Sequence, residues 1–396
     1  MLQDRTPIVS VDDHIIEPRH VWTSRLPQRY REQGPRIVEI DGGIERWIFE
    51  GEIQATVDGA TGLSAVAGTE LSERMRDPGR YDNMRPGCYD PVARLADMDL
   101  DGVSAQVLFP NFSRFAGMRF TTAKDKDLGL LCVRAYNDFI LDEWREASPD
   151  RYIPLIILPL WDVTLCVAEL ERCVAKGAKG LTFPDNPAML GMPSFYTDYW
   201  NPLFAAIEAA DLAICMHFGS AGVAPSLAAD GPAAAAAAVM GSTLFHSMSD
   251  LVFSPVLHRF SKLKILYSEG GIGWFPFAAQ RLDQVWEKYR FYQIVPTISA
   301  DHRPSDLIRR NVFGCFIDDQ LGIDLRHQIG VENITFETDY PHSDSIFPAS
   351  RDALARMMAD VPDDEVDKMV YGNACRLFNL DPATLVAPPT TVGGRA

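Results

Sequence analysis

IVSVDDH, residues 8–14, is a short β-branched run that ends in two acids and a histidine. The apolar part predicts a buried β-strand. Side chains two apart on a strand point to the same side, so Asp12 and His14 can face one point at the end of this strand. A pair of acids that simply ends a strand in a turn is the alternative interpretation.

Runs of the same kind recur along the chain and alternate with helical patterns. They predict strands at residues 8–12, 103–109, 153–158, 178–183, 212–217, 264–269, 312–316 and 333–338. Apolar stripes at three- and four-residue spacing predict helices at residues 89–102, 125–147, 162–177, 200–210 and 275–290. Strands that alternate with helices favour parallel pairing in a closed (β/α)8 barrel, the TIM barrel, and a doubly wound open sheet is the alternative.

Residues 34–87 interrupt this rhythm after the first strand. The run DGG at 41–43 lies between two alternating segments and predicts a β-hairpin, so we expect an inserted cap region here. A second long loop follows the fourth strand at 184–200, and the alanine run at 233–238 predicts a helix. We expect a single barrel domain over residues 1–380 and a flexible tail over residues 381–396.

The composition restricts the classes of partner. Hydrophobic residues make up 47% of the 396 residues, which is enough for a large core, and the formal net charge is −17. This charge repels phosphate backbones and anionic lipids, so we expect no nucleic-acid or membrane binding. Seven scattered cysteines without a CxxC pair and the lack of a secretory signal or a membrane-length apolar run favour the cytoplasm.

Two further strand ends carry residues that can bind a metal ion. His217 closes the run LAICMH, and Asp339 follows the run NITFET. Taken alone, a hydrogen-bonded core histidine and a turn aspartate are ordinary interpretations of these residues. With Asp12 and His14, however, they lie at the C-terminal ends of predicted strands one, five and eight, where barrel enzymes place catalytic groups. Two imidazoles and two carboxylates suit Zn²⁺, Mn²⁺ or Fe²⁺ and leave a position open for water or substrate.

The runs SVDDHIIEP (10–18), HFGS (217–220), SEGGIGWFPF (268–277) and ETDYPHSDS (337–345) resemble the amidohydrolase superfamily. They are most similar to the branch that includes aminocarboxymuconate-semialdehyde decarboxylase and the resorcylate decarboxylases, over residues 7–378. The resemblance implies a (β/α)8 barrel with one divalent ion per subunit, zinc before manganese or iron. It assigns Asp12, His14, His217 and Asp339 as ligands, and Asp339 also as a proton carrier.

The chain departs from this branch at the end of the sixth predicted strand. Decarboxylases of the branch usually have a histidine there, whereas this sequence has Glu269 in SEGGIG. A glutamate beside a metal can serve as a general base for bound water, which favours hydrolysis. It also adds negative charge where an anionic substrate must lie. A carboxylate that is salt-bridged or caps the following helix is an equally good interpretation.

Other residues near the predicted barrel mouth are secondary candidates for substrate binding. His342 can orient a substrate or lie at the surface, and Arg114 can bind a substrate carboxylate or form a surface ion pair. Asn111 lies beside Arg114 after the second predicted strand. Trp200 belongs to a loop whose aromatic residues either line a pocket or pack the loop. Asp318 and Asp319, in the run FIDDQ, are expected to form no more than a helix N-cap.

These observations together predict an enzyme that acts on a small organic molecule. We expect a metal-dependent hydrolase of a lactone, ester or amide, in which Asp339, Glu269 and His217 are the catalytic residues. The first alternative is a metal-dependent non-oxidative decarboxylase of an aromatic or unsaturated acid, and the second is a barrel that binds a ligand without turnover. Members of the branch are often homodimers, and an acidic barrel is compatible with that assembly.

Overall fold

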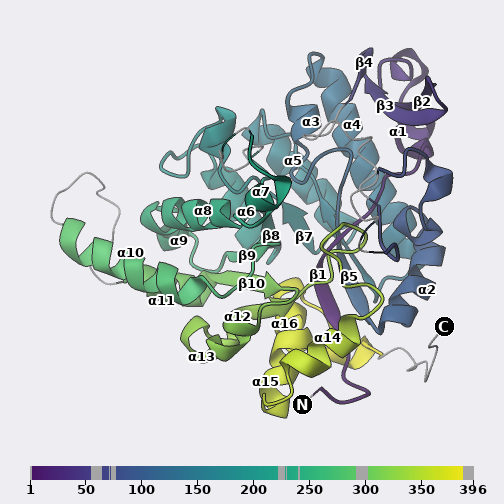
Figure 1. Cartoon of the computed structure of the whole chain (residues 1–396). Helices are drawn as coiled ribbons and strands as arrows, with labels where there is room; N and C mark the ends of the chain where they lie inside the picture. Colours follow the sequence, from purple (N-terminus) through teal and green to yellow (C-terminus); the bar gives the residue numbers. More distant parts are fainter. Residues whose placement is uncertain are drawn as a thin grey trace.

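The computed structural model describes residues 2–54, 65–70, 72, 77–221, 228, 230–239, 241–290 and 302–386. Within these residues, parallel strands close into an eight-stranded barrel in the order β1-β11-β10-β9-β8-β7-β6-β5, with helices around it (Figure 1). The barrel strands are β1 Val9–His14, β5 Ala105–Phe109, β6 Tyr152–Ile156, β7 Gly180–Thr182, β8 Ala213–His217, β9 Lys264–Ser268, β10 Val312–Phe316 and β11 Ile334–Phe336. The predicted (β/α)8 barrel is confirmed.

The helices follow the strands in the alternation that the sequence predicts. The longer ones are α2 Pro91–Asp101, α4 Lys126–Phe139, α5 Val163–Ala175, α6 Asn201–Ala209, α8 Ser242–Phe253, α10 Phe275–Tyr289, α11 Pro304–Asn311 and α14 Ser350–Met357. The shorter ones are α1 His20–Arg25, α3 Met118–Thr121, α7 Ala233–Ala237, α9 Val256–Arg259, α12 Gln320–Asp324, α13 Arg326–Ile329, α15 Asp363–Asp367 and α16 Asn373–Phe378. Aspartates at 90, 125 and 162 accept N–H groups at the starts of α2, α4 and α5, which explains where these helices begin.

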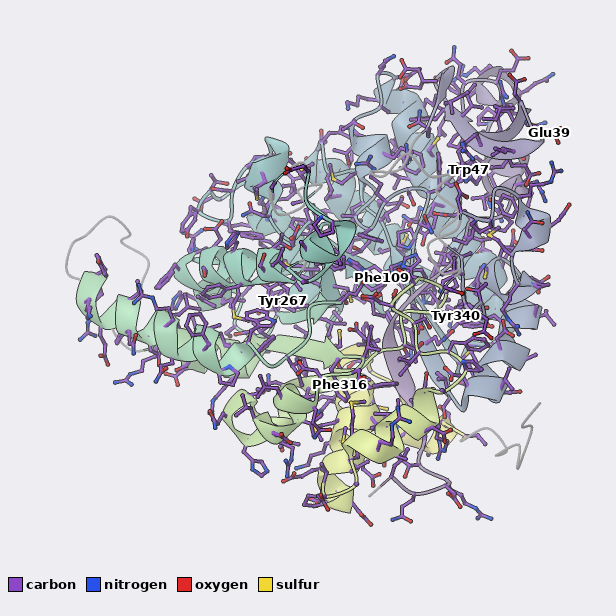
Figure 2. The ribbon with its side chains drawn as sticks, viewed as in Figure 1. Glu39, Trp47, Phe109, Tyr267, Phe316 and Tyr340 are labelled. Carbon is purple, nitrogen blue, oxygen red and sulfur yellow. The ribbon has the colours of Figure 1, made fainter. Side chains whose placement is uncertain are left out.

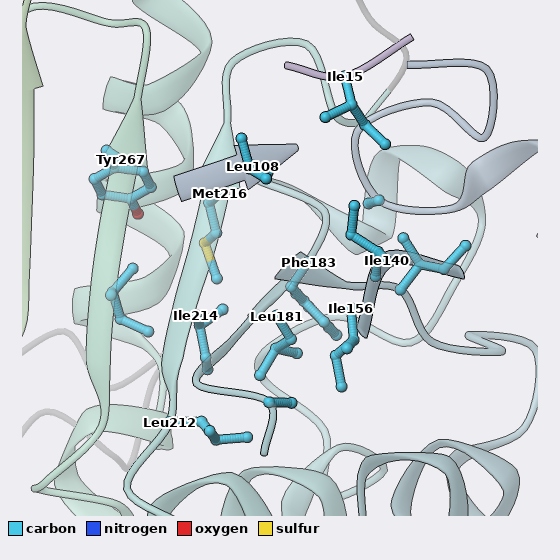
Figure 3. Packing of buried hydrophobic residues seen from close by; sticks show 14 of the residues in the cluster. Ile15, Leu108, Ile140, Ile156, Leu181, Phe183, Leu212, Ile214, Met216 and Tyr267 are labelled. Carbon is cyan, nitrogen blue, oxygen red and sulfur yellow. The ribbon is translucent and has the colours of Figure 1, made fainter. Parts of the chain in front are cut away.

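The barrel has an inner and an outer apolar layer. Inward residues such as Val9, Val11 and Cys215 fill the barrel, and Phe378 of α16 packs against them from the end opposite to the strand C-termini. Outward residues such as Ile214 and Met216 of β8 pack under the helices (Figure 3). This alternation leaves the C-terminal strand ends as the open rim for polar side chains.

The interruption after β1 contains the predicted hairpin. β2 Arg36–Ile40 and β3 Ile44–Phe49 pair antiparallel around the DGG turn, and β4 Glu52–Ile53 adds a third strand. The turn needs glycine, because Gly42 and Gly43 have φ of 83° and 75°. This small sheet lies beside α1 at one edge of the molecule (Figure 1). Residues 55–64, 71 and 73–76 of the expected cap region lie outside the described residues.

All seven cysteines are free and buried, in agreement with the absence of a disulfide framework. None of the described helices is both long enough and apolar enough to cross a bilayer. Residues 381–386 of the expected tail are described: Pro382–Thr384 form a short 3-10 helix and Leu385 packs against the inner layer, whereas residues 387–396 lie outside the described residues.

Candidate metal centre

Strand β1 places Asp12 and His14 at the rim through an irregularity in its pairing with β5. Between Ser10 and Asp13, β1 contains one more residue than the facing segment of β5. A β-bulge of this kind redirects the side chains that follow it. As a result, Asp12 and His14 meet at the mouth, with His14 Nε2 3.2 Å from Asp12 Oδ1.

Asp13, the residue between them, points to a different set of partners. Its carboxylate accepts the hydroxyl of Thr338 and, over 3.1 Å, the backbone N–H of Tyr340. Figure 2 labels Tyr340, in the segment after β11, and Phe109, the last residue of β5. Asp13 therefore ties β1 to the segment after β11, and only its two neighbours take part in the cluster.

His217 ends β8 with both ring nitrogens directed at specific groups. Its Nδ1 lies 2.7 Å from the carbonyl oxygen of Phe218, which can only accept, so Nδ1 carries the proton in the neutral ring. Nε2 then offers its lone pair to the cluster, 3.7 Å from Asp12 Oδ2 and 2.8 Å from Glu269 Oε2. This arrangement of a fixed Nδ1–H and a free Nε2 is typical of metal-ligating histidines.

Asp339 and His342 approach the same point from the segment after β11. Asp339 Oδ1 lies 3.4 Å from His14 Nε2 and 3.1 Å from His342 Nδ1. The His342 and His14 rings are 3.9 Å apart between centroids. Asp339 has a left-handed backbone with φ of 49°, which is unfavourable for a non-glycine residue and often found at functional sites.

Glu269 also has a left-handed backbone, with φ of 54°. Its N–H donates to Glu337 Oε2 over 3.1 Å, and its side chain contacts His217 as described above. The N–H groups of Ile272 and Gly273, in the turn before α10, donate to Asp319 instead. Glu269 is therefore not the cap of this turn, and its carboxylate belongs to the cluster.

The carboxylates of the cluster are buried close to one another. Burial and the neighbouring acids raise the pKa of Asp12 and Glu269 well above the usual range. Burial likewise opposes ionisation of Asp339, but His342 and His14 outweigh it and hold the pKa of Asp339 below its usual value. Several acids at one buried point call for a compensating positive charge.

The imidazoles are held in the form that binds cations. Burial lowers the pKa of His217 to about 4, and burial together with His342 lowers the pKa of His14 well below its usual value. Neutral imidazoles are the form of histidine that donates a lone pair to a metal. Apart from the contacts within the cluster itself, no described residue is a hydrogen-bond partner of Asp12 Oδ1 and Oδ2, His14 Nδ1 and Nε2, His217 Nε2, Asp339 Oδ1 and Oδ2, or His342 Nε2.

The potential ligand atoms form two sets, and His14 belongs to both. Within each set, the atoms all lie within 4.8 Å of one another. One set is Asp12, His14 and His217, and the other adds Glu269, Asp339 and His342 to His14. Buried donor atoms without partners, excess negative charge and neutral imidazoles all fit a divalent cation. The four side chains expected as ligands therefore gather around His14, with Asp12 and His217 in one set and Asp339 in the other.

Comparison with known proteins identifies the family. The family model described as amidohydrolase matches residues 19–380. The chain belongs to the amidohydrolase family.

This amidohydrolase is similar to curated decarboxylases over most of its length. It is 26% identical over 302 residues to a gamma-resorcylate decarboxylase from Polaromonas sp. (strain JS666), covering 73% of this chain and 87% of the relative. It is also 26% identical over 331 residues to a 2-amino-3-carboxymuconate-6-semialdehyde decarboxylase from Dictyostelium discoideum, covering 78% and 82%. The resemblance to this branch is confirmed, and hydrolysis is supported only as far as the superfamily.

Solved structures share the fold. An amidohydrolase from Mycobacterium avium subsp. paratuberculosis superposes with a TM-score of 0.73 at 21% identity, covering 94% of this chain and 99% of that one. A dihydroxybenzoic acid decarboxylase from Polaromonas sp., solved with manganese and the inhibitor 2-nitroresorcinol, gives a TM-score of 0.59 at 19% identity, covering 95% and 97%.

The secondary candidates lie in different environments in the amidohydrolase. Arg114 is exposed, and no described residue pairs with its guanidinium group. Asn111 Nδ2 is buried without a described partner. Trp200 is 1% exposed, and its indole N–H donates to the Pro193 carbonyl over 2.6 Å, so it packs the loop. A substrate-binding role for Trp200 stays a prediction that these contacts do not support.

Three residues that shape the centre could not be singled out from the sequence pattern. Glu337 accepts the backbone N–H of Glu269. The only sequence signal for Glu337 was an acidic residue within a buried segment. Glu17 accepts hydrogen bonds from the loop after β5, and its place in the run SVDDHIIEP was the available signal. Phe115 stacks on His217, and nothing in the sequence pattern indicates this contact.

Proposed function

We propose that this amidohydrolase is a metal-dependent, non-oxidative decarboxylase of an aromatic or unsaturated acid. The observation that carries the proposal is the buried cluster of two imidazoles and two carboxylates at the barrel rim. The names of the curated relatives favour decarboxylation over the hydrolysis that we expected from Glu269.

In this proposal, Asp12, His14, His217 and Asp339 hold one divalent ion. When bound, the ion would neutralise the acid group of the substrate and stabilise the negative charge that develops as the C–C bond breaks. The mixed nitrogen and oxygen donors suit zinc, our first expectation, and equally manganese, which is present in the structure of the Polaromonas enzyme.

The chain itself must handle one proton. Cleavage releases CO2 and leaves the bonding electron pair on carbon, which then takes up a proton. His14 and His342 keep Asp339 ionised. Asp339 must therefore first accept a proton, and an acidic hydroxyl group of the substrate can supply it. It then passes this proton to carbon. His342, whose Nδ1 lies 3.1 Å from Asp339 Oδ1 and whose side chain is 14% exposed, connects Asp339 with solvent.

The test uses planar acids that the solved relatives are named for. Protein loaded with zinc or manganese is incubated with 2,6-dihydroxybenzoate or 5-carboxyvanillate, and CO2 is measured together with loss of the acid. We expect release of CO2 in step with consumption of at least one planar acid, and no release with Asp339→Asn. Turnover of esters or lactones without CO2 from any acid would overturn the proposal.

Hydrolysis remains the second candidate function because of one observation. Glu269 Oε2 lies 2.8 Å from His217 Nε2, where a carboxylate can accept a proton from water. Under hydrolysis, Glu269→Gln should abolish turnover of a lactone substrate. Under decarboxylation, Glu269→His, which installs the residue usual in the branch, should retain CO2 release.

Binding without turnover is the third candidate. Elemental analysis separates binding without turnover from the two enzymatic functions, because purified protein without stoichiometric metal would favour binding alone.

A homodimer and a cytoplasmic location also stay predictions. Size-exclusion chromatography with light scattering tests the homodimer.

A further inference from the structure

The ring of Phe115 lies directly on one face of His217. The two ring centroids are 3.8 Å apart and the planes differ by 25°, so the rings are stacked. Phe115 also lies 5.3 Å from the ring of His14. It is thus the side chain of the loop after β5 that contacts both histidines expected to hold the metal.

Solvent reaches the cluster unevenly. Asp12, His14, His217 and Asp339 are all 0% exposed. Glu269 and His342 have side chains that are 11% and 14% exposed. Phe115 is itself partly exposed. Among the described residues, Phe115 therefore lies between solvent and the two histidines, while Glu269 and His342 mark the edge that is open.

The loop that carries Phe115 is held firmly in place. Both oxygens of Glu17 accept hydrogen bonds from this loop: the N–H groups of residues 111, 112 and 113 and the hydroxyl of Ser113. The ring of Phe112 packs on Trp47 of the inserted hairpin, with centroids 4.4 Å apart. A buried carboxylate with four donors and a paired aromatic ring fix the loop backbone from two sides.

The backbone at residue 114 turns the chain into this position. Arg114 has φ of 60°, a left-handed conformation that is unfavourable for a non-glycine residue. The N–H of Arg114 donates to the Asn111 carbonyl, and the N–H of Gly117 donates to the Arg114 carbonyl. The tight turn presents Phe115 to His217.

We propose that Phe115 is a specificity-determining residue of this site. Its bulk keeps water from His217 and His14, and its flat face forms the wall beside which a planar acid lies when it binds at the cluster. The role of the flat face rests on the proposed function, since it takes a planar acid as the substrate class. The role of the bulk, which excludes water, concerns only the chain and its ion.

The test separates bulk from flatness with two substitutions. Phe115→Ala removes both, whereas Phe115→Leu retains apolar volume and loses the flat face. Phe277→Ala is the matched control, because Phe277 is a 61% exposed phenylalanine on α10. Each protein is loaded with zinc and checked for native circular dichroism.

Two measurements are made on each variant. The first is the rate of zinc transfer to an excess of a coloured chelator. The second is the affinity for 2-nitroresorcinol, a planar probe, relative to cyclohexanecarboxylate, a non-planar acid. We expect Phe115→Ala to speed zinc release about tenfold or more and to lose about tenfold of the preference for the planar probe. Phe115→Leu should lose the preference while it releases zinc at nearly the wild-type rate.

Neither measurement needs turnover, so a failure of the proposed decarboxylation is seen separately, as absence of CO2 release by the wild-type protein. Zinc release from Phe115→Ala at the rate of Phe277→Ala overturns the inference. So does an unchanged preference for the planar probe in both Phe115 variants.

Discussion

The backbone N–H of Asp339 donates to the backbone carbonyl of Asp12 over 3.0 Å. The backbone N–H of His14 donates in turn to the carbonyl of Tyr340 over 2.6 Å. The first and last segments of the rim are thus joined by main-chain atoms. Their side chains can be changed without cutting this connection, so the ligand set can be tested by mutagenesis in a folded barrel.

His217→Ala should lose the metal and keep the fold. Nε2 of His217 contacts only Asp12 and Glu269, which belong to the cluster itself, so the substitution removes a ligand without breaking a contact of Nε2 to the rest of the barrel. Loss of one of four ligands should weaken metal affinity by roughly 100-fold or more. Elemental analysis after dialysis measures this, with circular dichroism as the check on folding. His246→Ala, on the exposed face of α8, is the control, and full metal content in His217→Ala would contradict the ligand assignment.

Metal removal should lower the thermal stability of the protein. Without a cation, the crowded acids Asp12, Glu269 and Asp339 lack a compensating charge. An ion present at 100 times its dissociation constant contributes about 2.7 kcal/mol to the free energy of unfolding. Calorimetry with a chelator, and again after addition of zinc or manganese, should show a fall and a recovery of the melting temperature. Equal melting temperatures in all three samples would argue against a resident ion.

Asp101 should make stability depend on pH. Its carboxylate accepts the N–H and hydroxyl of Ser350, yet burial raises its pKa to about 6 from an unfolded value near 3.8. Because the folded state holds the proton more tightly, this contribution is complete below pH 3.8 and is lost as pH rises through 6. Relative to Asp101→Asn, the wild-type protein should lose up to about 3 kcal/mol between pH 4 and 7. Urea unfolding of both proteins across this range is the measurement, and a constant difference would refute the assignment.

Asp319→Ala should destabilise the turn that follows Glu269. Asp319 accepts N–H groups from Ile272, Gly273 and Gly322, each over 2.8 Å. Loss of such a cap costs about 1–2 kcal/mol. Chemical denaturation should show this loss. Asp318→Ala is the matched control, since Asp318 is exposed beside it, and an equal effect of both substitutions would remove the special role of Asp319.

The sequence predicts the barrel well because its strands are buried on both faces. All eight predicted strands agree with the observed ones within two residues at either end. Strand ends meet on one rim of any such barrel, so the meeting of Asp12, His217 and Asp339 could be predicted without knowing a single distance.

Other features depend on pairing and packing that the sequence pattern does not carry. The bulge in β1 arises from the pairing of β1 with β5, and the run IVSVDDH contains only one of these two strands. The expected helix at 125–147 changes to a π-helix over Ile140–Arg145 for a similar reason, since periodicity alone does not specify the hydrogen-bond ladder. Trp200 in a loop fits either a pocket wall or a packed interior, and only its neighbours decide between them.

The extra residue in β1 has a consequence for protein engineering. It lies between Ser10 and Asp13, and so separates Val9, which fills the barrel, from His14, which belongs to the cluster. The residues that fill the barrel before the bulge can therefore be redesigned without turning Asp12 and His14 away from the cluster. A one-residue deletion within the bulge would instead disturb the direction of the side chains at this end of the strand.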